Sequence, residues 1–189
     1  PVFTQNFTKI RKDHTTFLQD EAERAKHYHK GIFVDIFPGD RVPSGKIGQK
    51  MQYIACAVNL LYSRGYTSGS GGVIGITEKV LLKAPKEKYA VWRERAEKWV
   101  RHWNGRESLQ YVFPNTIACS RRYYPANSFE EMKTIEFNRK QYMCVADANT
   151  ILHIEYGDYM QLPPEKDRVW THHPILIDFE HNYEELTQK

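Results

Sequence analysis

The sequence predicts an α+β fold in which a small mixed sheet packs with helices. Between residues 31 and 37, around Asp35, apolar side chains point to both faces of an extended segment, which is typical of an internal strand. Two segments, at about 45–64 and 86–103, repeat apolar residues at three-to-four spacing, as helices do. Residues 133–137 and 141–145 have strand composition around a turn at 138–140, which predicts a hairpin. We expect both helices to pack over the sheet that carries Asp35.

Length and composition limit the class of protein. A chain of 189 residues and 22.3 kDa suits one domain, spanning residues 1–189, and can bury a core. Hydrophobic residues make up 41% and aromatic residues 13%, which excludes a disordered chain. The three cysteines are widely spaced without a CxxC motif. Neither a disulfide framework nor a zinc site is therefore predicted, and a reducing compartment is expected.

Charge and hydropathy restrict the partners. A net charge of +4 and a pI near 8.9 fit an acidic partner, such as a phosphate compound, an anionic glycan or a membrane surface. These values are too weak to predict a nucleic-acid partner. No run approaches the length of a membrane-spanning helix, so no transmembrane segment is predicted in the residues shown. We expect a cytoplasmic protein, for which peripheral association with a membrane stays open.

The segment KIRKDHTTF, residues 9–17, combines a basic cluster with paired threonines, whose β-branched side chains favour a strand or its edge. A solvated basic loop is one interpretation. The alternative is a phosphate-facing segment formed by Arg11, Lys12, Thr15 and Thr16, because cationic groups beside hydroxyls suit phosphate oxygens.

The segment HKGIFVDIFPGD, residues 29–40, places one carboxylate inside an otherwise apolar strand. Phe33, Asp35 and Phe37 share one face of the extended chain, so Asp35 lies between two phenylalanines. An ionised carboxylate in apolar surroundings carries a large desolvation cost unless a positive or hydrogen-bonding group faces it. Two interpretations follow: backbone N–H groups or one arginine satisfy Asp35, or it is a metal ligand or catalytic carboxylate held on a rigid strand.

Two helices are expected in the middle of the chain. Ser44 can cap the first, which Gly65 ends. Its predicted core stripe consists of Ile47, Met51, Ile54, Val58 and Leu61. The glycine-rich segment 65–75 lacks the ending of a Walker motif and is expected to be a flexible connection. Pro85 suits the start of the second helix. Its predicted packing stripe consists of Tyr89, Trp92, Ala96, Trp99 and Trp103.

The last third of the chain is expected to contain a short helix at 148–155 and an edge strand or packed terminus at 175–179. Between them, residues 156–174 are too rich in glycine and proline for a helix, so we expect an ordered loop. We expect Arg168 and His172 to be its polar contributors to a donor or acceptor pocket. The alternative for Arg168 is a structural ion pair with Asp158 or Glu165.

Three segments, KIRKDHTTF, HKGIFVDIFPGD and EYGDYMQLPPEKDRVWTHHP, resemble in order the LicD family of phosphotransferases, which is related to fukutin and belongs to the nucleotidyltransferase superfamily. The resemblance spans nearly the whole chain and includes the long strings GIFVDIFP and YGDYMQLPPE. It implies a nucleotidyltransferase-like fold. It also implies transfer of a phosphorylated alcohol, such as phosphocholine, from a CDP-linked donor to teichoic acid or a cell-surface glycan such as lipopolysaccharide. The implied cofactor is Mg²⁺ or another divalent metal, and Asp35 resembles the family's later metal-binding carboxylate.

The family's first metal motif, an aspartate-rich cluster shaped like DDDxD, has no counterpart in this sequence. Phosphoryl transfer usually relies on metal held by more than one carboxylate, and Asp35 supplies one. In the family the missing motif precedes the KIRK-like segment, so we expect upstream residues to supply it. The alternative is a catalytically incomplete fragment or binding module for an anionic glycan. A third hypothesis is a nucleotidyltransferase that moves the nucleotide itself.

Overall fold

The computed structural model describes residues 7–114, 116, 119–169 and 173–187. The chain divides into two compact units. The strand unit comprises Phe7–Ile36 together with the segment from Met160 onward, and the helical unit comprises Phe37–Tyr159. Asp35 therefore belongs to the strand unit, whereas both predicted helices belong to the helical unit. The expected packing of these helices over the sheet that carries Asp35 stays a prediction. The expectation that residues 1–189 form a single domain also stays a prediction.

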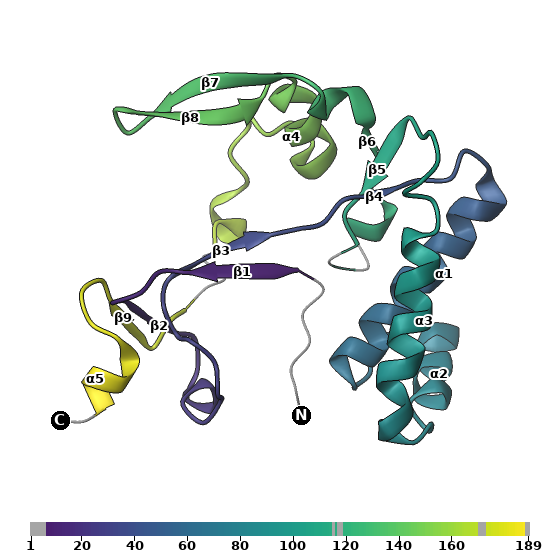
Figure 1. The fold of residues 1–189 in the computed structure, drawn as a ribbon, viewed down its shortest axis with the longest axis horizontal. Coiled ribbons are helices and arrows are strands. Elements are labelled where there is room, and N and C mark those ends of the chain that lie inside the picture. Colours follow the sequence, from purple (N-terminus) through teal and green to yellow (C-terminus); the bar gives the residue numbers. More distant parts are fainter. Residues whose placement is uncertain (1–6, 115, 117–118, 170–172, 188–189) are drawn as a thin grey trace. The chain divides into compact units, whose positions relative to one another are not determined.

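Two small antiparallel sheets form the strand unit, and β1 and β3 run side by side in Figure 1. Its strands are β1 (Thr8–Arg11), β2 (Thr16–Leu18), β3 (Phe33–Ile36) and β9 (Leu176–Asp178). β1 pairs with β3, and β2 pairs with β9. The unit also contains the short helix α5 (Tyr183–Thr187) and 3-10 turns at Glu21–Glu23 and Glu165–Asp167. Leu18 on β2 is fully buried between its neighbours.

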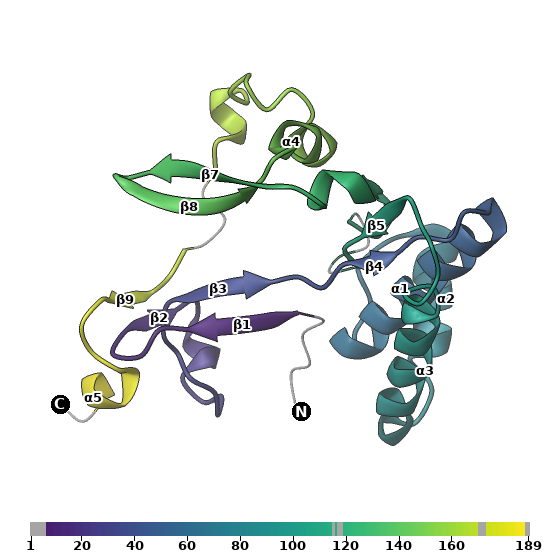
Figure 2. The same ribbon diagram turned by 45° about the horizontal axis from the view of Figure 1, so that its top comes forward.

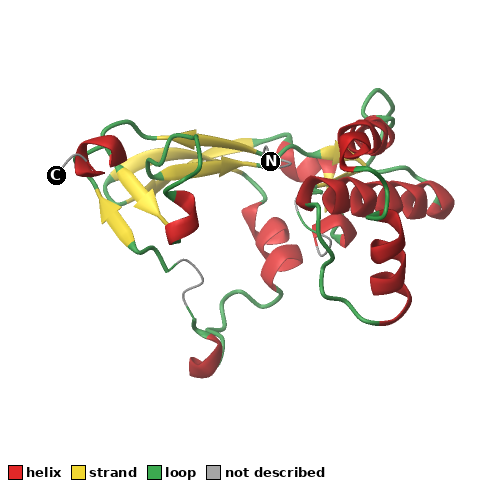
Figure 3. Cartoon of the chain, turned by 90° about the horizontal axis from the view of Figure 1, so that it is seen from below, coloured by secondary structure: helices red, strands yellow, loops and turns green. Residues whose placement is uncertain are grey.

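The helical unit contains most of the helix in the described residues, drawn in red in Figure 3. Its helices are α1 (Lys46–Arg64), α2 (Gly72–Leu81), α3 (Tyr89–Arg101) and α4 (Ala148–Tyr156). Its strands are β4 (Asp40–Arg41), β5 (Gln110–Val112), β6 (Tyr124–Pro125), β7 (Met132–Phe137) and β8 (Lys140–Val145). The first three strands form an antiparallel sheet in the order β4-β5-β6. Its 3-10 turns are at Lys86–Lys88, Cys119–Arg121 and Ala126–Phe129.

α1 and α3 pack against each other around Ala55, Cys56 and Val100. The buried side chain of Gln52 on α1 donates to the carbonyl oxygens of Arg41, at 2.8 Å, and Val100, at 3.1 Å. Because a buried amide is costly without partners, these bonds fix α1 to β4 and α3. α1 ends as predicted, with Gly65 in the left-handed region at φ 76°, but Gly45 rather than Ser44 is its N-cap.

The predicted core stripe of the first helix is wrong in its N-terminal half. Ile47, Met51 and Ile54 are 80%, 45% and 51% exposed, whereas Leu61 is buried. α1 instead buries a face that begins at Gln52 and includes the small residues Ala55 and Cys56, which allow α3 to approach closely. In the predicted stripe of the second helix, Ala96 is buried, but Trp92 and Trp99 are about half exposed.

α2 begins inside the segment expected to be a flexible connection. At Gly75 a Cβ atom would lie 2.1 Å from the carbonyl oxygen of Ser70, so only glycine permits this close approach. The Glu78 carboxylate accepts from the backbone N–H of Ser68 at 2.7 Å and pairs with Arg64 at 2.9 Å. Burial opposes ionisation of Glu78, but the Ser68 and Arg64 contacts outweigh it and lower its pKa. These contacts fix α2 to the end of α1.

The strand around Asp35, the helix after residue 147 and the hairpin are confirmed. β7 and β8 lie side by side in Figure 2, with Lys133 opposite Cys144 and Phe137 opposite Lys140. Asn138 and Arg139 connect them with φ values of 50° and 61°, which suits a two-residue hairpin turn. The described residues thus form a mixed α and β structure with small sheets. Among them, no helix has the length and apolar composition needed to cross a bilayer.

Candidate functional site

The β1–β3 sheet brings the basic segment and the Asp35 segment together. Its register places Lys9 opposite Asp35 and Arg11 opposite Phe33. Alternate residues of a strand share a face, and directly opposite residues of two strands share the same face. Lys9, Arg11, Phe33 and Asp35 therefore lie on one side of the sheet, which we call the Lys9 face.

Asp35 is compensated by a lysine. The ammonium nitrogen of Lys9 lies 2.6 Å from Oδ1 of Asp35, and the two side chains are 15% and 27% exposed. The cation provides the countercharge that a half-buried carboxylate needs. The interpretation in which Asp35 is satisfied within the fold requires a partner for its carboxylate, and the structure provides one. That partner is Lys9, rather than an arginine or backbone N–H groups.

Aromatic rings support the two cations of the Lys9 face. The Lys9 ammonium lies 3.5 Å from the ring centroid of Phe33, and the Arg11 guanidinium carbon lies 5.0 Å from the rings of Phe33 and Tyr28. Arg11 also donates to the carbonyl oxygen of Gly31 at 3.0 Å. None of the ion pairs found in the described residues neutralises Arg11. The Lys9 face therefore presents two cations and one carboxylate, with positive charge in excess.

The position of the Asp35 strand depends on close backbone contacts behind it. The buried hydroxyl of Thr15 donates to the carbonyl oxygen of Lys12 at 2.7 Å and accepts from the backbone N–H of Ile32 at 3.0 Å. A Cβ atom at Gly31 would lie 2.1 Å from that same Lys12 oxygen. The hydroxyl of Thr16, also buried, donates to the carbonyl oxygen of His181 at 2.9 Å. Both threonine hydroxyls are used within the fold, so a phosphate-binding role for either would require these bonds to break.

The remaining predicted site residues lie elsewhere. Lys12 follows the end of β1 and is exposed. Arg168 is exposed and donates to the carbonyl oxygen of Pro163 at 2.7 Å, whereas no ion pair in the described residues joins it to Asp158 or Glu165. His172 falls outside the described residues. The structure thus brings Arg11 and Asp35 together, and it places Thr15 and Thr16 in the support behind them.

Asp35 does not make a metal site with its described neighbours. No group of three or more His, Cys, Asp or Glu side chains in the described part of the chain could hold a metal ion. Oδ1 of Asp35 is also engaged by Lys9. Mg²⁺ prefers six oxygen ligands, of which a protein usually supplies one or two carboxylates. The residues of the Lys9 face therefore do not by themselves fit this ion.

Sequence reasoning placed Phe33 beside Asp35 but missed Lys9 as part of this site. Alternation in the KIRK segment could have identified Lys9, because residues two apart in a strand share a face and Arg11 was already a candidate. Pairing Lys9 with Asp35, which lies 26 residues later in the chain, additionally requires the register between their two strands. No local pattern contains that register.

A separate pocket of about 300 Å³ lies in the helical unit. Its wall includes Pro43 and Gly48 near the start of α1, and Trp103 and Arg106 after α3. The Arg106 guanidinium carbon lies 4.7 Å from the ring centroid of Trp103. None of the predicted site residues lines this pocket.

No family model matches the chain, and neither a curated protein nor a solved structure is similar enough to count as a match.

Proposed function

We propose that this chain provides the donor-binding strands of a LicD-like phosphotransferase, which moves a phosphorylated alcohol such as phosphocholine from a CDP-linked donor to a cell-surface glycan or teichoic acid. The observation that carries the proposal is the Lys9 face. Two of the three segments that resemble the family pair as neighbouring strands, and their charged residues meet on one side. A rigid strand that presents cations beside a carboxylate suits a phosphate-transfer site.

The chemistry assigns a different task to each charged group. In the transfer, a bond forms between the acceptor oxygen and the phosphorus, the bond from that phosphorus to CMP breaks, and the acceptor hydroxyl loses its proton. Arg11, which makes no ion pair with a carboxylate among the described residues, would neutralise the donor diphosphate. Each charge-assisted contact to phosphate contributes about 1.5–3 kcal/mol when shielded. Asp35 would take the acceptor proton or hold a divalent metal, whose other ligands would come from outside the described residues.

The test is turnover of a CDP-linked donor by this chain and by any longer natural form that contains it. We expect Asp35→Asn to lower kcat by orders of magnitude while the protein stays folded at the assay temperature, and Arg11→Met to raise the KM for the donor about tenfold. Lys140→Met, which removes an exposed cation from the hairpin, is the matched control. Retained turnover in Asp35→Asn would rule out the proposal. Release of CMP rather than pyrophosphate separates it from nucleotidyl transfer.

A binding module for an anionic glycan is the second candidate, and the compensation of Asp35 by Lys9 favours it. In that case the Lys9 face would bind a polyanion without catalysing a reaction. Calorimetric titration with purified teichoic acid, in the absence of donor, is the measurement. Binding that Arg11→Met weakens, combined with no turnover in any form of the protein, would support the module over the enzyme.

A further inference from the structure

α2 carries an apolar row that faces solvent. Val73, Ile76 and Val80 are 80%, 65% and 58% exposed and recur at three-to-four spacing, so they lie on one side of the helix. The opposite side is the one fixed to the unit, through Gly75 against Ser70 and Glu78 against Arg64. We call these three exposed residues the α2 row. Apolar residues gathered on the free side of a helix indicate a surface that is covered in use.

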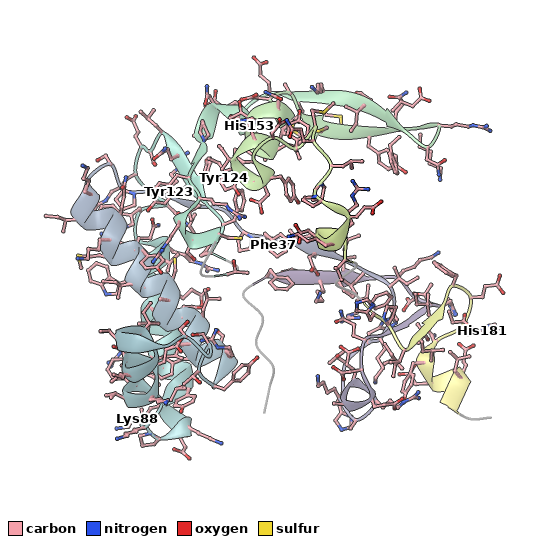
Figure 4. The ribbon with its side chains drawn as sticks, turned by 180° about the vertical axis from the view of Figure 1, so that it is seen from behind. Phe37, Lys88, Tyr123, Tyr124, His153 and His181 are labelled. Atoms are coloured by element: carbon pink, nitrogen blue, oxygen red, sulfur yellow. The ribbon has the colours of Figure 1, made fainter. Side chains whose placement is uncertain are left out.

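Lysines accompany the α2 row in the sequence. Lys79 and Lys83 lie three residues from members of the row, and Lys86 and Lys88 follow before α3 begins. All four lysines are exposed, and Lys88 is labelled in Figure 4. Between residues 79 and 88 the sequence contains one acidic residue, Glu87. The α2 row and these lysines together have the composition of a helix that lies in a membrane interface.

The charge of the chain is concentrated around these helices. Residues 46–106 contain 12 Lys and Arg against 4 Asp and Glu, a net charge of +8, whereas the whole chain has +4. The remainder, with 15 basic and 19 acidic residues, is therefore at −4. This local excess of positive charge attracts the helices to an anionic surface.

We infer that the α2 row and Lys79, Lys83, Lys86 and Lys88 form a docking surface for an anionic lipid bilayer. The apolar row would enter the interface between headgroups and acyl chains, while the lysines would contact anionic headgroups. A second copy of the chain fits less well, because an isologous contact would bring two regions of +8 together. Nucleic acid fits less well too, because valine and isoleucine contribute nothing to phosphate contacts.

On the neighbouring helix α3, Trp92 and Trp99 are about half exposed, and the Arg95 guanidinium carbon lies 5.2 Å from the Trp92 ring. Tryptophan and arginine are residues that favour the headgroup region. These residues add side chains that favour the headgroup region to the same helical unit. The inference does not rest on the proposed function, because it concerns residues outside the Lys9 face.

Co-sedimentation with vesicles tests the inference, using phosphatidylcholine alone and phosphatidylcholine mixed with phosphatidylglycerol. The chain should bind the anionic vesicles and lose binding as salt is added. Replacing the α2 row by serine, or the four lysines by glutamine, should weaken partitioning about tenfold or more. The matched control is Lys133→Gln with Lys140→Gln on the exposed hairpin, which lowers the net charge elsewhere and should weaken binding far less.

Thermal unfolding of each variant separates lost binding from lost folding, since the changed side chains are exposed. If the triple serine variant unfolds, Ile76→Asp alone keeps the test decisive. Wild-type binding by the serine or aspartate variant would overturn the inference, as would equal loss in the hairpin control. A concentration-dependent dimer that Ile76→Asp abolishes, without vesicle binding by the wild type, would assign the α2 row to a second copy and also overturn it.

Discussion

Removing either member of the Lys9–Asp35 pair should destabilise the strand unit, and by different amounts. Lys9→Met keeps the length of the stem but leaves the Asp35 carboxylate beside Phe33 without a cation. Asp35→Asn keeps one acceptor oxygen and leaves the Lys9 ammonium on the Phe33 ring, 3.5 Å from its centroid. Because the ring still favours a cation, we expect Lys9→Met to cost more than Asp35→Asn.

The magnitude follows from the burial of the pair. Exposed ion pairs contribute about 0–1 kcal/mol, whereas a hydrogen bond to a charged group contributes about 1.5–3 kcal/mol. At 2.6 Å, with side chains 15% and 27% exposed, this pair lies between those cases. We expect a coupling energy of about 1–2 kcal/mol, with Lys9→Met alone costing about 2 kcal/mol and Asp35→Asn alone about 1 kcal/mol.

Urea unfolding of the wild type, both single variants and the double variant gives the coupling energy. The matched control is the pair of Arg101 and Glu97 on α3, which has a similar distance of 2.7 Å but side chains 59% and 40% exposed. Its coupling should be about 0.3–0.5 kcal/mol and should vanish at high salt, whereas the Lys9–Asp35 coupling should persist in part. A Lys9–Asp35 coupling no larger than that of the control, or a gain of stability in Asp35→Asn, would refute the reasoning.

Three further predictions concern single positions. Gly31→Ala should destabilise the strand unit by about 1–3 kcal/mol in urea unfolding, because its Cβ would meet the Lys12 carbonyl oxygen; unchanged stability would contradict this contact. Arg139→Gly should stabilise the hairpin by about 0.4–1 kcal/mol, because it relieves a positive φ of 61°, and slower amide exchange in β7 and β8 would report it. Burial is the main cause that raises the pKa of Asp40 above 3.8, although a hydrogen bond from Asn104 partly opposes it. The ionised form therefore costs stability above the raised pKa, so Asp40→Asn should be more stable at neutral pH, with a difference that disappears as pH falls towards 3.8.

The elements that sequence reasoning predicted correctly depend on local patterns. The strand around Asp35 follows from its dense apolar residues and the Pro-Gly pair that ends it, and the hairpin follows from two strand-like runs around a short turn. The face that α1 buries could not be predicted in the same way. Its apolar residues occupy more than one side, and the choice depends on α3, which packs where Ala55 and Cys56 leave room. Burial of Cys56 also raises the pKa of its thiol to about 12, so the packing choice removes it as a nucleophile.

Sequence reasoning also predicted some residues of the candidate site correctly and others incorrectly. Asp35 was identifiable because a carboxylate breaks an apolar strand, and that signal is contained in a few residues. Thr15 and Thr16 were selected for their chemistry, yet both hydroxyls are bonded within the fold. Whether a hydroxyl is free depends on the segment packed behind it. For Thr16 that segment contains His181, which is 165 residues away in the sequence.

The Lys9–Asp35 pair gives a last prediction that separates binding from chemistry. For Lys9 to contact a phosphate, it must leave Asp35. Because this step loses about 1–2 kcal/mol of coupling energy, it weakens anion binding by Lys9 about 5–30-fold relative to a lysine without a carboxylate partner. Asp35→Asn removes both this competition and the repulsion between carboxylate and phosphate. The variant should therefore bind inorganic pyrophosphate several-fold more tightly than the wild type, as measured by calorimetry, while donor turnover falls. Lys9→Met should bind pyrophosphate no more tightly than the wild type, because it lacks the cation that Asp35→Asn releases. Weaker pyrophosphate binding by Asp35→Asn would mean that Lys9 serves Asp35 alone, and Arg11 would then remain as the phosphate contact of the Lys9 face.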